Sequence, residues 1–174
     1  MLTLDFYRRP ADELAPLLLG KLLCRNIDGR IYRYRITETE AYGKDDTACH
    51  AHKGMTPRNK PMFEDGGIAY VYLCYGIHEM FNIVAGVKDC PEAVLIRGVE
   101  GFPGPGKLTK ALKIDRDLNG ISLASNRVWL EDERSIGKKL DLAQKYEVAG
   151  ISAWRLNFEK EAIWGLIGEY VRQK

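Results

Sequence analysis

The sequence predicts a single α+β domain over residues 1–174. Two pairs of extended segments are each joined by a short turn signal, and two short helical patterns flank them. A chain of this length can also remove roughly 70% of its unfolded surface from water in one core. We therefore expect one domain that needs neither a disulfide nor a metal to hold it together.

The first element is a helix predicted over residues 10–19. Pro10 suits the first helical turn, and Asp12 and Glu13 are favourable near the positive end of the helix. Pro16 must kink or shorten this helix because it donates no backbone hydrogen bond.

Two β-hairpins are predicted next. Asp28-Gly29 separates extended segments at 21–26 and 30–42, and this dipeptide tolerates the positive φ of a tight turn. The second hairpin pairs 68–74 with 79–85, and a long ordered loop over 43–67 connects the two. Further along we expect a strand over 93–99, a helix opening after 103–107, a strand over 127–131 and a helix over 140–146.

Composition narrows the function classes. Apolar residues make up 45% of the chain, which excludes intrinsic disorder, and the net charge of +2 is too small to hold nucleic acid by bulk charge. A local basic patch is still compatible with that charge. The four cysteines form no CxxC pair, and the chain shows neither a secretory leader nor an apolar run of about 20 residues. We expect a cytoplasmic protein with reduced thiols and no membrane contact.

Two glutamates are the first candidate catalytic groups. In the extended segment at 30–42, alternate side chains point to the same face of the strand. One face would therefore carry Tyr34, Ile36, Glu38, Glu40 and Tyr42. The two glutamate Cα atoms would be about 6.6 Å apart, and an apolar setting beside a like charge raises the pKa of at least one carboxyl. That setting suits a general acid or base. In the alternative, both glutamates pair with Arg33, Arg35 or Arg97 in a solvated rim, and alternation does not decide which glutamate acts.

Apolar side chains stand at the predicted turn of the second hairpin. Tyr72 and Tyr75 fall on opposite strand faces by strict alternation, so both can serve one site only if Tyr75 lies beyond the strand end. Tyr75 and Ile77 at an exposed tip would form a projecting wedge of the kind that enters a base stack. The alternative is a tip packed against the 43–67 loop.

Three further features have both a functional and a structural interpretation. Asn82 is predicted to be buried, where its amide ties a loop to a strand or sorts substrates by their polar edges. Gly104 to Lys107 is either an ordinary turn or a phosphate contact at a helix start. The third feature is a group of residues of metal-ligating types: Asp45, Asp46, His50 and His52. Their spacing matches no specific zinc or iron pattern, so we expect no catalytic metal there.

Five segments carry a family resemblance when they are read in order: Arg35–Tyr42, Thr56–Asn59 with Met62-Phe63, Tyr70–Gly76 with Asn82, Leu95–Arg97 and Gly104–Leu108. Together they resemble the animal-type alkyladenine (3-methyladenine) DNA glycosylase family. Fainter similarity continues through 117–120 and 154–156, so the resemblance covers most of the chain.

The resemblance implies a curved antiparallel sheet flanked by helices, with a protruding β-hairpin and no metal or cofactor. It selects Glu40 as the general base and Arg97 as the residue that helps hold the attacking water. The base pocket would be lined by Tyr42, His50 and Tyr72, and Asn82 would disfavour guanine.

The same resemblance implies how DNA is bound. Tyr75, beside Ile77, would fill the gap left in the duplex by a flipped nucleotide, and Lys107 would lie near backbone phosphates. The partner is double-stranded DNA containing alkylated or deaminated purines, and the protein would act as a monomer. Since no lysine stands out as a Schiff-base nucleophile, we expect a monofunctional glycosylase that leaves an abasic site.

Two other functions fit the residues. A carbohydrate glycosidase would use Glu38 and Glu40 as its carboxylate pair, although the tryptophans that would stack on sugars are distant in sequence, at Trp129, Trp154 and Trp164. A damaged-DNA-binding module would use the hairpin wedge without catalysing base release.

Overall fold

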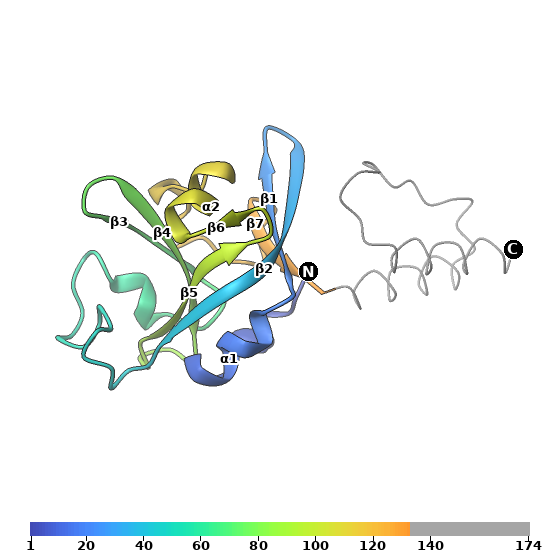
Figure 1. Ribbon diagram of the computed structural model, residues 1–174. Helices are drawn as coiled ribbons and strands as arrows, with labels where there is room; N and C mark the ends of the chain where they lie inside the picture. Colours follow the sequence, from blue (N-terminus) through green and yellow to red (C-terminus); the bar gives the residue numbers. More distant parts are fainter. Residues whose placement is uncertain (133–174) are drawn as a thin grey trace, which may run out of the picture.

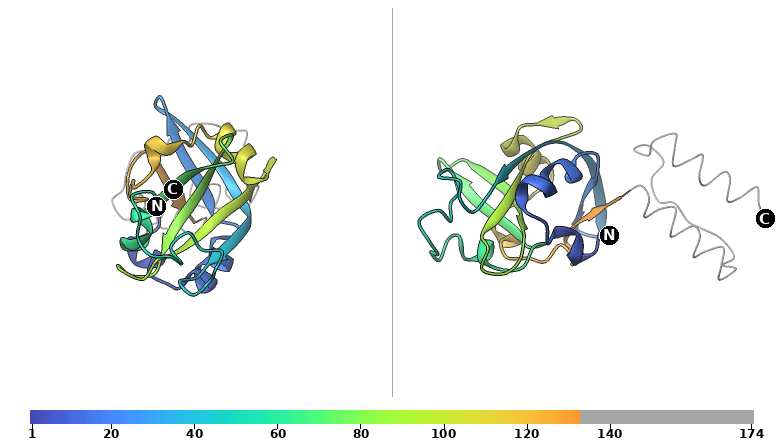
Figure 2. Two further views of the ribbon diagram at one scale, coloured as in Figure 1. Left: turned by 90° about the vertical axis from the view of Figure 1, so that its left-hand side faces the viewer. Right: turned by 90° about the horizontal axis from the view of Figure 1, so that it is seen from below.

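The computed structural model describes residues 1–132 (Figure 1). Its strands form one antiparallel sheet in the order β3-β4-β5-β2-β1-β7, and β6 pairs with β5 beside this path. The strands are β1 (Leu22–Ile27), β2 (Arg30–Tyr42), β3 (Ala69–Cys74), β4 (His78–Ala85), β5 (Glu92–Val99), β6 (Phe102–Pro103) and β7 (Val128–Glu131). The sheet curls into a half-barrel (Figure 2), so the predicted α+β class is confirmed.

The helical elements are short. They are α1 (Ala11–Leu18), α2 (Pro105–Ala111) and the 3-10 turns η1 (Leu4–Tyr7), η2 (Lys60–Phe63) and η3 (Arg116–Leu118). Both predicted helices of the described region are present, and Pro16 lies inside α1, which ends two residues later. The helix predicted over 140–146 and the resemblance at 154–156 lie outside the described residues. Among residues 1–132, no helix is long and apolar enough to cross a membrane.

The main core lies between the two helices and one face of the sheet. Leu14 and Leu18 of α1 and Leu108 of α2 are completely buried in one cluster with Phe81 of β4, and so is Leu112, which directly follows α2. Burying each such side chain contributes about 1.5–3 kcal/mol relative to leaving it exposed. This core holds the sheet rigid and so fixes the positions of the side chains on its other face.

The first hairpin turns as the sequence predicts. Asp28 and Gly29 have φ values of 53° and 81°, and Ile27 pairs directly with Arg30. Positive φ at both central residues defines the type I′ turn that matches strand twist. The second hairpin differs slightly from its prediction, because His78 belongs to β4 and pairs with Cys74 rather than lying in the turn.

The prediction of uninterrupted alternation along β2 is wrong. The register with β5 shifts on both sides of Glu38, and such irregularities bend and twist a strand. Ile36 and Ala41 consequently pack against the same main core although they are five positions apart, which regular alternation would place on opposite faces. Glu40 and Tyr42, which flank Ala41, face the other side of the sheet. The even-numbered side chains from Tyr34 to Tyr42 therefore do not all lie on one face of β2.

Candidate active site

A row of side chains crosses four strands on the face opposite the main core. Tyr70 of β3 pairs with Asn82 of β4, Asn82 pairs with Leu95 of β5, and Leu95 pairs with Glu40 of β2. Residues directly opposite one another in paired strands point to the same face. The row therefore brings an aromatic ring, an amide and a carboxylate from distant parts of the chain onto one surface.

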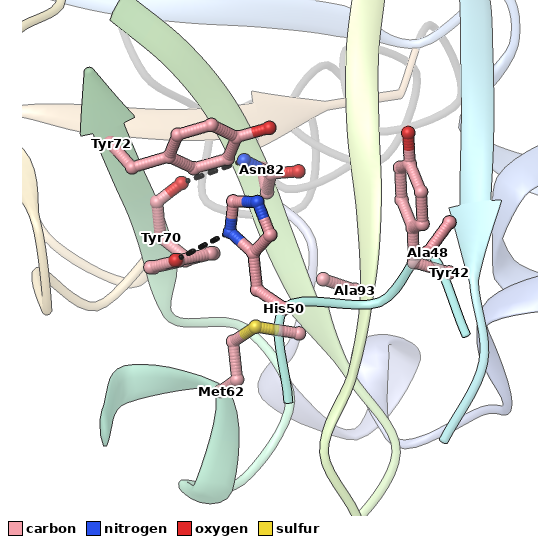
Figure 3. A pocket seen from close by; sticks show the side chains of 8 residues that line it. All are labelled: Tyr42, Ala48, His50, Met62, Tyr70, Tyr72, Asn82 and Ala93. Carbon is pink, nitrogen blue, oxygen red and sulfur yellow. Dashed lines mark hydrogen bonds between the residues drawn. The ribbon is translucent and has the colours of Figure 1, made fainter. Parts of the chain in front are cut away.

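A pocket opens on this face beneath the loop that follows β2. Its lining residues are Tyr42, Ala48, His50, Met62, Tyr70, Tyr72, Asn82 and Ala93. Figure 3 shows Tyr42 on one side, His50 and Tyr72 on the other, and Asn82 behind them. The four residues predicted to bind the base, from β2, the loop, β3 and β4, thus share one cavity.

Three rings form one wall of this pocket. The His50 and Tyr72 rings lie 4.4 Å apart between centroids, and Nδ1 of His50 is 3.0 Å from the Tyr70 hydroxyl. Burial lowers the pKa of His50, and the positive charge of Arg58 lowers it further. The imidazole is therefore held neutral at physiological pH. A neutral ring presents a flat stacking surface without a charge that would repel a cationic ligand.

The loop residues around Asn59 hold this wall in place. Asn59 is only 2% exposed, and its Nδ2 donates to the backbone oxygens of His50 at 2.9 Å and of Gly54 at 3.0 Å. Its Oδ1 accepts from the backbone N–H of Thr56 at 2.6 Å. Arg58 lies over the Tyr72 ring, 5.1 Å from its centroid. Asn59 thus fixes the backbone from which His50 projects.

The lowered pKa of His50 predicts a stability effect. As the pH falls, His50 is protonated in the unfolded chain, at its ordinary pKa of 6.5, before it is protonated in the folded chain. The contribution of neutral His50 to folding stability is therefore complete above pH 6.5. It is lost as the pH falls from there through the lower folded pKa. We expect His50→Phe to reduce the drop in Tm between pH 7.5 and 5, measured by thermal melts. An unchanged pH dependence in the variant would contradict this.

A carboxylate stands at the rim of the pocket. Glu40 Oε1 accepts a 2.8 Å hydrogen bond from the Tyr42 hydroxyl, and Oε2 accepts a 2.6 Å bond from Arg97 Nη1. Glu40 does not itself line the cavity; Tyr42, which does, connects the two. Arg97 Nε also donates to Glu38 Oε1 at 3.2 Å. Both glutamates therefore pair with Arg97, as expected in the alternative that places them in a solvated rim. Arg33, another partner considered in that alternative, pairs with Glu131 instead.

These contacts fix the charge state of the donors. Hydrogen bonding and charge from Glu40 raise the pKa of Arg97. Burial, followed by the bond to Glu40, raises the pKa of Tyr42. Both groups therefore keep their protons at neutral pH and present them to the carboxylate. Two charged or polar donors on one carboxylate hold its plane in a single orientation.

Asn82 forms the back of the pocket. It is 3% exposed, and its Nδ2 donates to the backbone oxygens of Tyr70 at 3.1 Å and of Met80 at 3.4 Å. The amide therefore ties strand to strand rather than loop to strand. In Figure 3 its oxygen points toward the space beside Tyr42. A fixed acceptor at the back of an aromatic pocket can discriminate between ligands by their polar edges.

The tip of the β3–β4 hairpin is separate from the pocket and projects from the body of the protein beside α2 (Figure 1). Tyr75 is 94% exposed and Ile77 is 73% exposed, as the predicted projecting tip requires, so the alternative in which the tip packs against the 43–67 loop is excluded. Tyr75 lies just beyond the last residue of β3, as sharing a site with Tyr72 requires.

Lys107 is exposed on α2, near the tip end of the same hairpin. A Cβ on Gly106 would come within 2.7 Å of His78 Nδ1, so only glycine allows α2 to approach the first residue of β4 this closely. Thr109 Oγ1 also donates to the backbone oxygen of Glu79 at 3.0 Å. The structure thus places Lys107 and the hairpin tip in one neighbourhood.

The metal-ligating residue types do not converge in the described part of the chain. Within residues 1–132, no group of three or more His, Cys, Asp or Glu side chains is arranged to hold a metal ion, and this includes Asp45, Asp46, His50 and His52. All four cysteines are unpaired.

Three residues of this region had no predicted role in the site. Tyr70 is two positions from Tyr72, and strand alternation alone would have placed both rings on one face. Arg58 and Asn59 lie in the Thr56–Asn59 segment of the resemblance, but their contacts depend on how the loop folds back. Such contacts cannot be seen in local spacing.

Comparison with known families decides the relationship. The family model described as methylpurine-DNA glycosylase matches residues 5–103, more than half of the chain. The chain belongs to the methylpurine-DNA glycosylase family. The match includes β1 to β6 and therefore every residue of the pocket and its rim, together with the hairpin tip; Lys107 lies just beyond it. The predicted resemblance is confirmed, and members of the methylpurine-DNA glycosylase family hydrolyse N-glycosyl bonds.

Relatives of this chain occur in several bacteria. A Psychrobacter cryohalolentis protein named "Putative 3-methyladenine DNA glycosylase" is 45% identical over 161 residues, covering 74% of this chain and 76% of the relative. Proteins with the same name are 43% identical in Chlorobium phaeobacteroides, covering 73% and 74%, and 47% identical in Borreliella afzelii, covering 70% and 72%.

Proposed function

We propose that this methylpurine-DNA glycosylase flips alkylated or deaminated purines out of double-stranded DNA and hydrolyses their N-glycosidic bond, leaving an abasic site. It would act as a monomer, with water activated by Glu40. The observation that carries the proposal is the position of Glu40, held by Tyr42 and Arg97 at the rim of an aromatic pocket.

Extrusion of the base comes first, because the glycosidic bond of a stacked base is shielded. A damaged base that pairs poorly is cheaper to extrude by up to a few kcal/mol. Tyr75 is suited to fill the space that the base leaves, since it is exposed at the end of a projecting hairpin. Lys107 is a cation near the tip end of that hairpin, where it can meet a phosphate. Discrimination would therefore begin before the chemical step.

The pocket then selects the base by stacking. The hollow is about 50 Å³ as it stands, a few water molecules in size, so it would have to widen to hold a whole purine. Tyr42 and Tyr72 would stack on the base. A purine made cationic by alkylation gains a cation–π attraction of about 0.5–2 kcal/mol over a neutral one. Asn82 would disfavour guanine by crowding its exocyclic amine.

Hydrolysis uses one water and no covalent enzyme intermediate. As the C1′–N bond breaks, its electron pair goes to the base and the sugar acquires oxocarbenium character. Glu40 stabilises that positive charge, takes a proton from the water, and lets the hydroxyl oxygen bond to C1′. Arg97 helps to hold the water beside Glu40. An alkylated purine is a good leaving group because it departs as a neutral molecule.

A substrate panel tests the proposal. The purified protein is expected to release methylated purines from duplex DNA treated with a methylating agent, measured by chromatography of the free bases, and to leave abasic sites without strand cleavage. Aryl glycosides, offered in parallel, are expected to remain intact. The described tryptophan, Trp129, is buried in β7, where Nε1 donates to Glu131 at 2.9 Å, away from the glutamate pair. Cleavage of glycosides without base release would establish the carbohydrate alternative instead.

A further inference from the structure

We propose that Glu38 is a positioning residue for this reaction: it orients the Arg97 guanidinium toward Glu40 and offsets part of its charge. This inference rests on the proposed function, in which Glu40 is the base. The function itself gives Glu38 no role, although the sequence alone cannot distinguish the two glutamates.

The geometry shows a shared cation. Arg97 donates through Nε to Glu38 at 3.2 Å and through Nη1 to Glu40 at 2.6 Å. Because the guanidinium is planar and rigid, fixing Nε fixes the direction of Nη1. Glu38 is also placed by the backbone, since the register shifts on each side of it set it opposite Gly98.

The Glu38 carboxylate also changes the net charge around Glu40. Arg97 paired with Glu40 alone would cancel the negative charge that the forming oxocarbenium needs. With Glu38 included, the three side chains carry a formal charge of −1, and part of the Arg97 charge is directed away from Glu40. Glu38 is 56% exposed at its side chain, so solvent and salt screen its effect. We therefore expect a moderate contribution to the rate rather than an essential one.

Two substitutions separate orientation from charge. Glu38→Gln keeps an oxygen that can accept from Arg97 Nε but removes the charge, and Glu38→Ala removes both. With enzyme in excess over a methylated duplex, we expect the single-turnover rate to fall about threefold for Gln and about tenfold for Ala. Glu100→Gln, an exposed glutamate just after β5, is the matched control and should retain the full rate.

The pH profile supplies a readout that a purely structural role would not move. The ionisable groups facing Glu40 are Glu38 and Tyr42 on β2, Arg97 on β5 and Tyr72 on β3. Without the Glu38 charge, Arg97 favours the ionised form of Glu40 more strongly, so the acid limb of the rate profile should move to lower pH in both variants.

The outcomes are distinct. Rates within twofold of wild type for both Glu38 variants, or a normal rate in Gln beside a slow Ala, would overturn the proposal that charge and orientation act together, and an unmoved acid limb would do the same. If the wild-type protein releases methylated purines and Glu40→Gln does not, while the Glu38 variants behave as wild type, only this inference fails. If Glu40→Gln remains active, the proposed function fails with it.

Discussion

Glu40→Gln is expected to reduce the single-turnover rate of methylated-purine release by about 10³-fold, within the range that loss of a general base produces. Gln has the same shape, and its oxygen can still accept one of the hydrogen bonds that Glu40 receives from Tyr42 and Arg97. What it lacks is the charge that stabilises the oxocarbenium and the basicity that deprotonates water. The loss should therefore be specific to chemistry.

Binding separates this result from damage to the fold. The Glu40→Gln protein should still bind a modified duplex with nearly wild-type affinity, measured by fluorescence anisotropy, and should melt at nearly the same temperature. Glu13→Gln, an exposed glutamate on α1, serves as the control for loss of one carboxylate and should keep the full rate. Base release by Glu40→Gln at the control's rate would remove Glu40 from its role. Wild-type protein that binds modified DNA but releases no base would establish the non-catalytic binding module.

Local signals in the sequence were sufficient for most of the fold. The hairpin at Asp28-Gly29 followed from a dipeptide that tolerates positive φ, and β5 and α2 followed from their apolar patterns. η1, η2, η3 and β6 were not predicted, because elements of two to four residues carry too few positions for any periodicity to show.

The candidate site was predictable only where neighbours in sequence are neighbours in space. Alternation correctly put Glu40 and Tyr42 on one face, but it also put Ile36 there, because the irregularity at Glu38 is set by pairing with β5. The contact of His50 with Tyr70, twenty residues apart, depends on how the 43–67 loop folds over the sheet. The family resemblance had assigned His50 to the pocket; spacing alone had not.

The second hairpin has an unusual tip, and the type of residue there is informative. Tyr75 and Gly76 have φ values of 50° and 74°, and the Ile77 N–H donates to the Cys74 oxygen at 3.2 Å. This is the type I′ geometry that the Asp28-Gly29 turn also adopts. Asn or Asp is preferred at the first position of such a turn, and a tyrosine there costs about 1–2 kcal/mol of backbone strain. A strained residue with an exposed ring points to a function outside the fold.

Tyr75→Ala is accordingly expected to weaken the complex with a flipped nucleotide without lowering Tm. Loss of a stacking ring typically costs about 1–3 kcal/mol, so retention of the flipped base should fall roughly 10- to 100-fold, measured from the quenching of a fluorescent base analogue and from kcat/KM for methylated DNA. Tyr75→Gly should show the same loss with an equal or higher Tm, since glycine adopts the positive φ without strain. Val87→Ala, at the opposite end of β4 and also exposed, is the control and should change neither quantity.

The two Tyr75 variants together distinguish the wedge from a packing role. If the ring stabilised the hairpin, both substitutions would lower Tm, and activity would fall only in proportion to the unfolded fraction. If the ring acts in DNA, activity is lost at temperatures where both variants are fully folded, and the loss is largest for lesions that still pair with the opposite base. A flipped base that pairs well returns readily to the duplex, so it depends most on a side chain that occupies the vacated space.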